Sequence, residues 1–87
     1  MTVIVEAPKN VIPRIQEVWV ALSVDEGGEG VCATMVGNTL MPLIAADEVR
    51  LEWITQQAEL VARMSGRNVR LVKLTQRVDV KEFSGAH

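Results

Sequence analysis

The sequence is poor in the side chains on which most catalytic and metal sites depend. It contains one cysteine, Cys32, and one histidine, His87, which is the last residue. One cysteine cannot form an intramolecular disulfide. One cysteine and one histidine together are too few for a structural zinc site, which takes four such ligands. Because His87 lies in an expected frayed tail, residues 84–87, a Cys–His catalytic pair is not expected either. We therefore predict a protein that is not an enzyme and that has no metal or other cofactor.

Aromatic residues and excess positive charge are also lacking. The chain has no tyrosine, two tryptophans and one phenylalanine, and its formal net charge is −2. Proteins that bind single-stranded nucleic acids combine a basic groove with stacking aromatic rings. The composition therefore does not favour nucleic acid as a partner.

Long apolar runs and targeting signals are missing as well. The longest uncharged stretch, from Gly30 to Ala46, is interrupted by Gly37 and Pro42 and falls short of the ~20 apolar residues of a spanning helix. Residues 1–6 lack the basic region and long apolar run of a signal peptide. With a lone Cys32, these features predict a cytoplasmic protein without membrane contact.

What remains is the composition of one small globular domain. The chain has 87 residues, of which 48% are hydrophobic and 23% charged, values that are ordinary for folded proteins. We expect one domain over residues 1–87, with residues 1–13, which contain Pro8 and Pro13, as an extended lead-in.

Alternating apolar and polar residues predict a strand over residues 14–24. One face of this strand carries Val18, Val20, Leu22 and Val24, and the other carries Glu17, Trp19, Ala21 and Ser23. Glycines 27 and 28 predict a two-residue turn into a returning strand over residues 31–36. This turn would place Val24 opposite Val31, Leu22 opposite Ala33 and Val20 opposite Met35.

Two further strands are expected. Gly37 and Asn38 form a second two-residue turn, leading into residues 39–44. Pro42 cannot donate to a ladder, so this third strand is short or lies at an edge, and the first three strands form a meander. Alternation returns from Asn68 to Lys81 and predicts a final strand whose place in the sheet the sequence does not reveal.

Residues 46–65 are predicted to form a long helix. Asp47 can cap its start, and Gly66 can end it in the left-handed conformation. The predicted fold class is therefore α+β, in the order β-β-(β)-α-β, with an antiparallel sheet of 3–4 strands and one long helix packed on one face.

This helix offers more apolar surface than one sheet needs. One stripe, Leu51, Ile54, Ala58, Val61 and Ala62, is expected to pack on the sheet. A second stripe is formed by Val49, Trp53, Leu60 and Met64. Either the N-terminal segment, residues 3–11, or a second subunit would have to cover it. Trp19, on a sheet face expected to be otherwise polar or lined by small residues, raises the same question, and all five residues are interface candidates.

Charge is distributed unevenly along the chain. Residues 1–62 carry three basic and nine acidic side chains, a net charge of −6, whereas residues 63–87 carry six basic and two acidic, a net charge of +4. Lys73, Arg77 and Lys81 share one parity of the last strand and could contact an anion or nucleic acid. Alternatively, they form cross-strand pairs with Glu17 and neighbouring acids.

These features predict a small non-enzymatic protein-interaction or homodimerisation module, which could also have a separate protein partner. The alternative is a small-ligand-binding protein with a pocket between helix and sheet or at a dimer seam.

Overall fold

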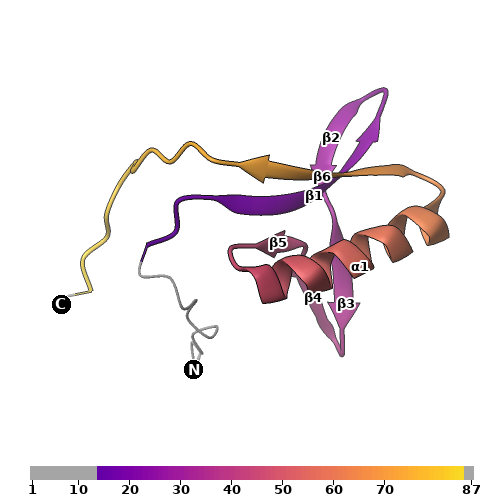
Figure 1. The fold of residues 1–87 in the computed structure, drawn as a ribbon, viewed down its shortest axis with the longest axis horizontal. Coiled ribbons are helices and arrows are strands. Elements are labelled where there is room, and N and C mark those ends of the chain that lie inside the picture. The colour runs from indigo at the N-terminus through magenta and orange to yellow at the C-terminus, as the bar shows by residue number, and fades with distance from the viewer. Residues whose placement is uncertain (1–13, 86–87) are drawn as a thin grey trace.

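The structure, a computed structural model, describes residues 14–85 of the chain. The predicted lead-in, residues 1–13, and its proposed packing over Trp53 lie outside the described residues, as do the last two residues of the predicted tail. Within the described part the elements are β1 (Val18–Asp25), β2 (Gly28–Val31), β3 (Ala33–Val36), β4 (Thr39–Pro42), β5 (Ile44–Ala45), α1 (Glu48–Ser65) and β6 (Asn68–Leu74) (Figure 1).

The predicted α+β class, with antiparallel strands and one long helix, is confirmed. Five strands precede α1 rather than two or three. The reason is that two of the predicted strands each break in two, the first at Cys32 and the second at Leu43.

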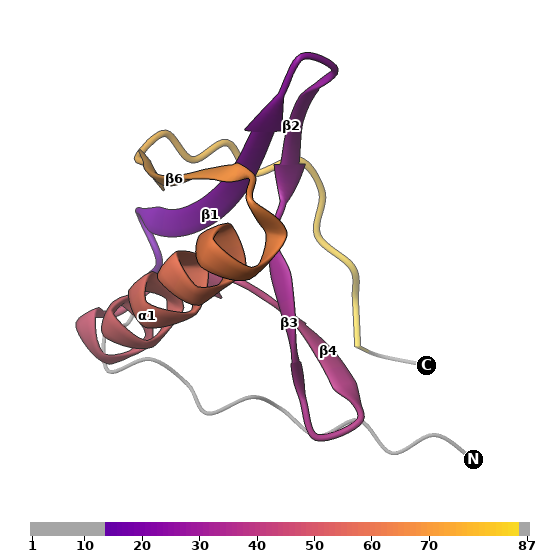
Figure 2. The ribbon, with the colours of Figure 1, turned by 90° about the vertical axis from the view of Figure 1, so that its right-hand side faces the viewer.

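Strand β1 is the centre of the main sheet. β6 pairs with it along one edge, while β2 and β5 share the other edge. β3 and β4 pair only with each other, so the predicted three-stranded meander is wrong. Figure 2 shows the β1–β2 and β3–β4 hairpins projecting in opposite directions from the middle of the molecule.

Three backbone hydrogen bonds join the strands at the point where they exchange partners. Ala21 N–H donates to Leu43 O at 3.0 Å, Cys32 N–H to Ala21 O at 2.9 Å, and Leu43 N–H to Cys32 O at 2.8 Å. Each residue thus uses one donor and one acceptor, and the breaks leave none of these buried groups unpaired. We call this ring of Ala21, Cys32 and Leu43 the junction.

The first hairpin turns one residue earlier than predicted. Asp25 pairs with Gly28 and Leu22 with Val31, so the predicted pairing of Val24 with Val31 is wrong by two residues. The Asp25 side chain fixes this turn, because its Oδ1 accepts a 2.8 Å hydrogen bond from Gly27 N–H. A two-residue shift leaves every side chain on its predicted face.

Local signals placed the second turn and the helix ends correctly. Gly37, with φ +61°, and Asn38 join β3 to β4 as predicted. Asp47 caps α1 through a 2.8 Å hydrogen bond from Arg50 N–H, and Gly66 closes it in the left-handed conformation. The last strand, however, ends at Leu74, and residues 75–85 form no regular secondary structure.

The helix packs on the β1 face that carries Trp19 and Ala21. Ile54 and Ala58 of α1 are buried, with Leu51 and Val61 beside them, which confirms the predicted packing stripe. The buried core cluster consists of Ala21, Cys32, Leu43, Ala45, Ile54 and Ala58. Its small sheet residues allow the helix to approach closely, which the bulkier valines of the opposite face would hinder.

We expect Leu43→Ala to lower the free energy of unfolding by about 2–5 kcal/mol, because Leu43 is fully buried at the junction. Urea denaturation followed by circular dichroism measures this. Leu60→Ala, at an exposed helix position, is the matched control and should cost less than about 1 kcal/mol. Equal losses for the two variants would contradict a core centred on the junction.

Candidate interaction surface

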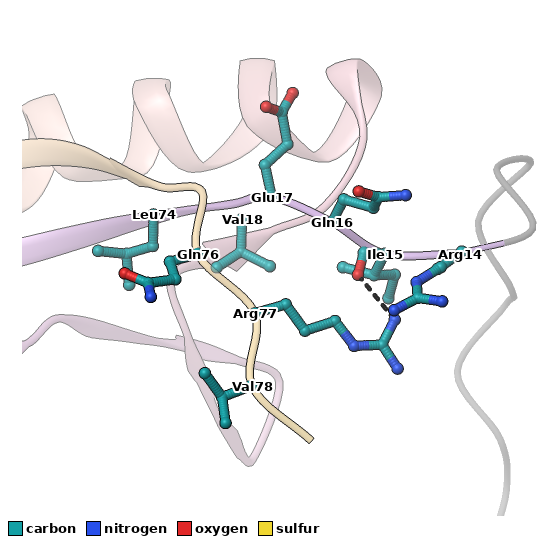
Figure 3. Close-up of a pocket in the computed structure, with 9 residues that line it drawn as sticks. All are labelled: Arg14, Ile15, Gln16, Glu17, Val18, Leu74, Gln76, Arg77 and Val78. Carbon is teal, nitrogen blue, oxygen red and sulfur yellow. Dashed lines mark hydrogen bonds between the residues drawn. The ribbon is translucent and has the colours of Figure 1, made fainter. Parts of the chain in front are cut away.

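The face of the sheet turned away from α1 is apolar. Directly paired residues of antiparallel strands share a face, and the register places Val31 beside Leu22, Ile44 and Val72 beside Val20, and Leu74 beside Val18. Figure 3 shows Val18 and Leu74 pointing away from α1, whereas Glu17 points toward it.

This face continues onto the projecting hairpin. Thr34 of β3 turns toward the helix, since its hydroxyl donates a 3.4 Å hydrogen bond to Gln57 Oε1. The next residue, Met35, therefore faces the other way, together with its partner Leu40. Met35 is 58% exposed and Leu40 64% exposed. We call the combined surface the outer face: Val18, Val20, Leu22, Val24, Val31, Met35, Leu40, Ile44, Val72 and Leu74; of these, Val20 is itself buried by its neighbours.

The outer face is unusually apolar for a solvent-facing sheet. Val31, Ile44 and Leu74 are exposed along with the two hairpin residues. Together these side chains expose on the order of 500 Å², which is at the upper end of what monomeric proteins show. The charged side chains on this face are Glu29, opposite Val24 toward the free end of the β1–β2 hairpin, and Arg70, opposite Leu22 on the edge strand β6.

The five interface candidates from the sequence lie elsewhere. Val49 and Met64 on α1 are 82% and 79% exposed, and Leu60 is also exposed. Trp53 is only partly exposed and packs against the core, with the Arg50 guanidinium 5.8 Å from its ring centre. Their role at an interface stays a prediction.

The sequence predicts that Trp19 lies on a solvent-facing face of the sheet, and this prediction is wrong. Trp19 packs against the core on the helix side, and Lys73 Nζ lies 5.6 Å from its ring centre. The expectation was wrong because alternation shows which residues share a face but not which face the helix selects. The small residues near Trp19, among them Ala21 and Cys32, form the surface on which the helix packs.

The three basic candidates are spread out, and each has a neighbour. Lys73 Nζ lies 3.2 Å from Glu17 Oε2, the cross-strand pair offered as the alternative. Arg77 donates to Asp79 at 2.8 Å and to the Ile15 carbonyl at 3.1 Å, and Lys81 lies over the ring of Phe83 at 5.1 Å. Anion binding by this group stays a prediction.

A groove of about 780 Å³ runs where the segment before β1 passes the segment after β6. Figure 3 shows its lining residues: Arg14, Ile15, Gln16, Glu17, Val18, Leu74, Gln76, Arg77 and Val78. No residue of α1 lines this groove, so it differs from the pocket between helix and sheet that the sequence offers as an alternative. Through Val18 and Leu74 the groove adjoins the outer face.

Two features of the described residues concern metal binding and thiol reactivity. No three His, Cys, Asp or Glu side chains between residues 14 and 85 lie close enough together to hold a metal ion. Cys32 is buried at the junction, and burial raises the pKa of its thiol. It therefore fills space in the core instead of presenting a thiolate. Over the same residues, no helix has the length and hydropathy needed to cross a membrane.

Native Cys32 should react with a thiol reagent such as DTNB at pH 8 at least ~100-fold more slowly than the urea-unfolded chain. Both the closed site and the raised pKa of the thiol lower the rate, since only the accessible thiolate attacks. The pKa of the Cys32 thiol is higher in the folded protein than in the unfolded chain. The protein should therefore lose stability as the pH rises above the pKa that the thiol has in the unfolded chain. Equal labelling rates for native and unfolded protein would show that the junction is open.

The chain was also compared with known proteins. None of the protein-family models, curated proteins or solved structures matches it.

Proposed function

We propose that this chain is a non-enzymatic homodimerisation module in which two copies pack outer face against outer face. The observation that carries the proposal is the position of α1 on the opposite side of the sheet, because among residues 14–85 no helix covers the valine-rich surface of β1 and its neighbours. Antiparallel sheets normally combine one packed face with one polar face.

A second copy fits this surface better than a partner of different chemistry. Its middle is apolar and without charge, so it has no feature that would select a charged partner. A two-fold interface brings the same patch of both subunits together, and an apolar sheet face packs well on a like face. The formal net charge of −2 on each chain adds little repulsion.

The available area is close to what a dimer requires. Stable interfaces bury about 800 Å² on each partner. The exposed apolar side chains supply on the order of 500 Å², and the partly exposed Val18, Leu22, Val24 and Val72 add to it. Apolar centres of this kind are typical of homodimers that form permanently.

The groove supports a second candidate function, the binding of a small molecule. It combines apolar and polar side chains, among them Val18, Leu74 and Gln76, as ligand sites commonly do. Because the groove adjoins the outer face, a face-to-face dimer would place it at the subunit seam. Thermal-shift measurements against a metabolite panel test this candidate, and a reproducible stabilisation removed by Gln76→Ala would support it.

For the dimer, we expect Met35→Glu to weaken association at least ~30-fold, since the new carboxylate would be buried without a partner. Sedimentation equilibrium of the full chain over a wide concentration range measures the dissociation constant. Val36→Glu is the matched control, because Val36 is the next residue, is 50% exposed and lies on the other side of the hairpin. It should change the dissociation constant less than ~3-fold.

Met64→Glu separates the two possible dimers. It lies on the exposed helix stripe and should leave the outer-face dimer intact. If it abolishes association while Met35→Glu does not, the helix stripe is the interface and the outer-face proposal fails. A monomeric parent at several hundred micromolar would overturn self-association altogether.

A further inference from the structure

The outer edge of β6 is a long and regular strand edge. All seven residues of β6 pair in unbroken register with β1, from Asn68 opposite Val24 to Leu74 opposite Val18. Among the described strands β6 pairs with β1 and with no other. Its second edge therefore presents a row of backbone N–H and C=O groups without a strand beside it.

The shape of this edge does nothing to prevent pairing. Proteins protect free edges with proline, bulges, very short strands or charged side chains. β6 contains no proline or glycine, and its register with β1 has no bulge. The edge strand on the other side, β2, has four residues, two of them glycine. Of these two edges, β6 is the one suited to accept a further strand.

Charge indicates what kind of strand fits. Arg67 and Arg70, at the start of β6 and within it, are exposed, and neither forms an ion pair among residues 14–85. Arg63, in contrast, is paired with Glu59 on the helix, and Lys73 with Glu17. The two unpaired guanidinium groups belong to the part of the chain with net charge +4. Such an edge repels a second copy of itself and attracts acidic side chains.

We propose that β6 is a docking edge for an acidic, extended peptide segment of a partner protein, which adds to the main sheet as a further strand. Backbone hydrogen bonds would hold the segment, as in other cases of strand addition. Carboxylates flanking Arg70 would alternate with apolar residues flanking Leu71, because these neighbours lie on opposite faces. This surface is the edge of the sheet; it adjoins the outer face of the proposed dimer, on which Arg70 lies opposite Leu22.

The probe is a fluorescein-labelled peptide of about nine residues that alternates glutamate and valine. Fluorescence anisotropy should show saturable binding to the full chain at low salt, weakened by added salt. Arg67→Glu combined with Arg70→Glu should lower the affinity at least ~10-fold. Arg14→Glu combined with Arg63→Glu makes the same change in net charge at residues that lie neither in β6 nor directly before it, and should lower the affinity less than ~3-fold.

Backbone pairing needs its own control. Two versions of the peptide are N-methylated at alternate positions, one at the glutamates and one at the valines, so that each loses the amide hydrogens on one edge. One version should lose most of its binding and the other should retain it. Amide chemical shifts in ¹⁵N-labelled protein should change along residues 68–74, with slower hydrogen exchange there.

The proposal fails if both N-methylated peptides bind like the parent peptide. It also fails if oligo-dT competes as well as unlabelled peptide, since the basic edge would then attract any polyanion. Shift changes confined to other elements, or no binding at low salt, would overturn it as well.

Discussion

The ring of backbone hydrogen bonds among Ala21, Cys32 and Leu43 is the constraint on which the fold depends. At this point three strand pairs meet, and each chain segment leaves one partner for another without losing a backbone hydrogen bond. Without these hydrogen bonds, a change of strand partner in the interior would leave backbone polar groups buried and unpaired, at a cost of ~1–3 kcal/mol for each group. The ring therefore makes possible a branched sheet in so short a chain.

The side chains at this ring decide where the helix lies. Ala21 and Cys32 are small and buried, and with Leu43 they form the floor on which Ile54 and Ala58 pack. The helix thus covers the face on which the small residues Ala21 and Cys32 lie, and Val18, Val20, Leu22 and Val24 of β1 are left on the other side. The exposed outer face and the compact core are two results of the same packing choice.

Local chemistry made part of this structure predictable. Asp47 and Gly66 mark the helix ends, and Gly37 marks a turn, because in each case one side chain or one backbone conformation decides the outcome. The alternation in β1 correctly showed which residues share a face. The ion pair of Glu17 with Lys73 was foreseen as an alternative, since opposite charges on neighbouring strands attract.

The remaining features depend on contacts that are distant in the sequence. Both faces of β1 carry apolar residues, so period-two alternation could not tell which one the helix would cover. The breaks at Cys32 and Leu43 follow from the meeting of three segments and have no local marker. The site candidates on α1 rest on the apolar surplus of the helix, but the sheet also exposes apolar side chains, among them Val31, Ile44 and Leu74.

The ring residues are evenly spaced along the chain, at positions 21, 32 and 43, and a hairpin turn lies about midway along each interval. In each interval the chain leaves the ring, forms a hairpin and returns to the ring. Adding or removing one cross-strand residue pair within such a hairpin changes the length of the hairpin and leaves the ring unchanged. The two hairpins can therefore differ in length or in turn sequence among variants that keep the same ring and helix.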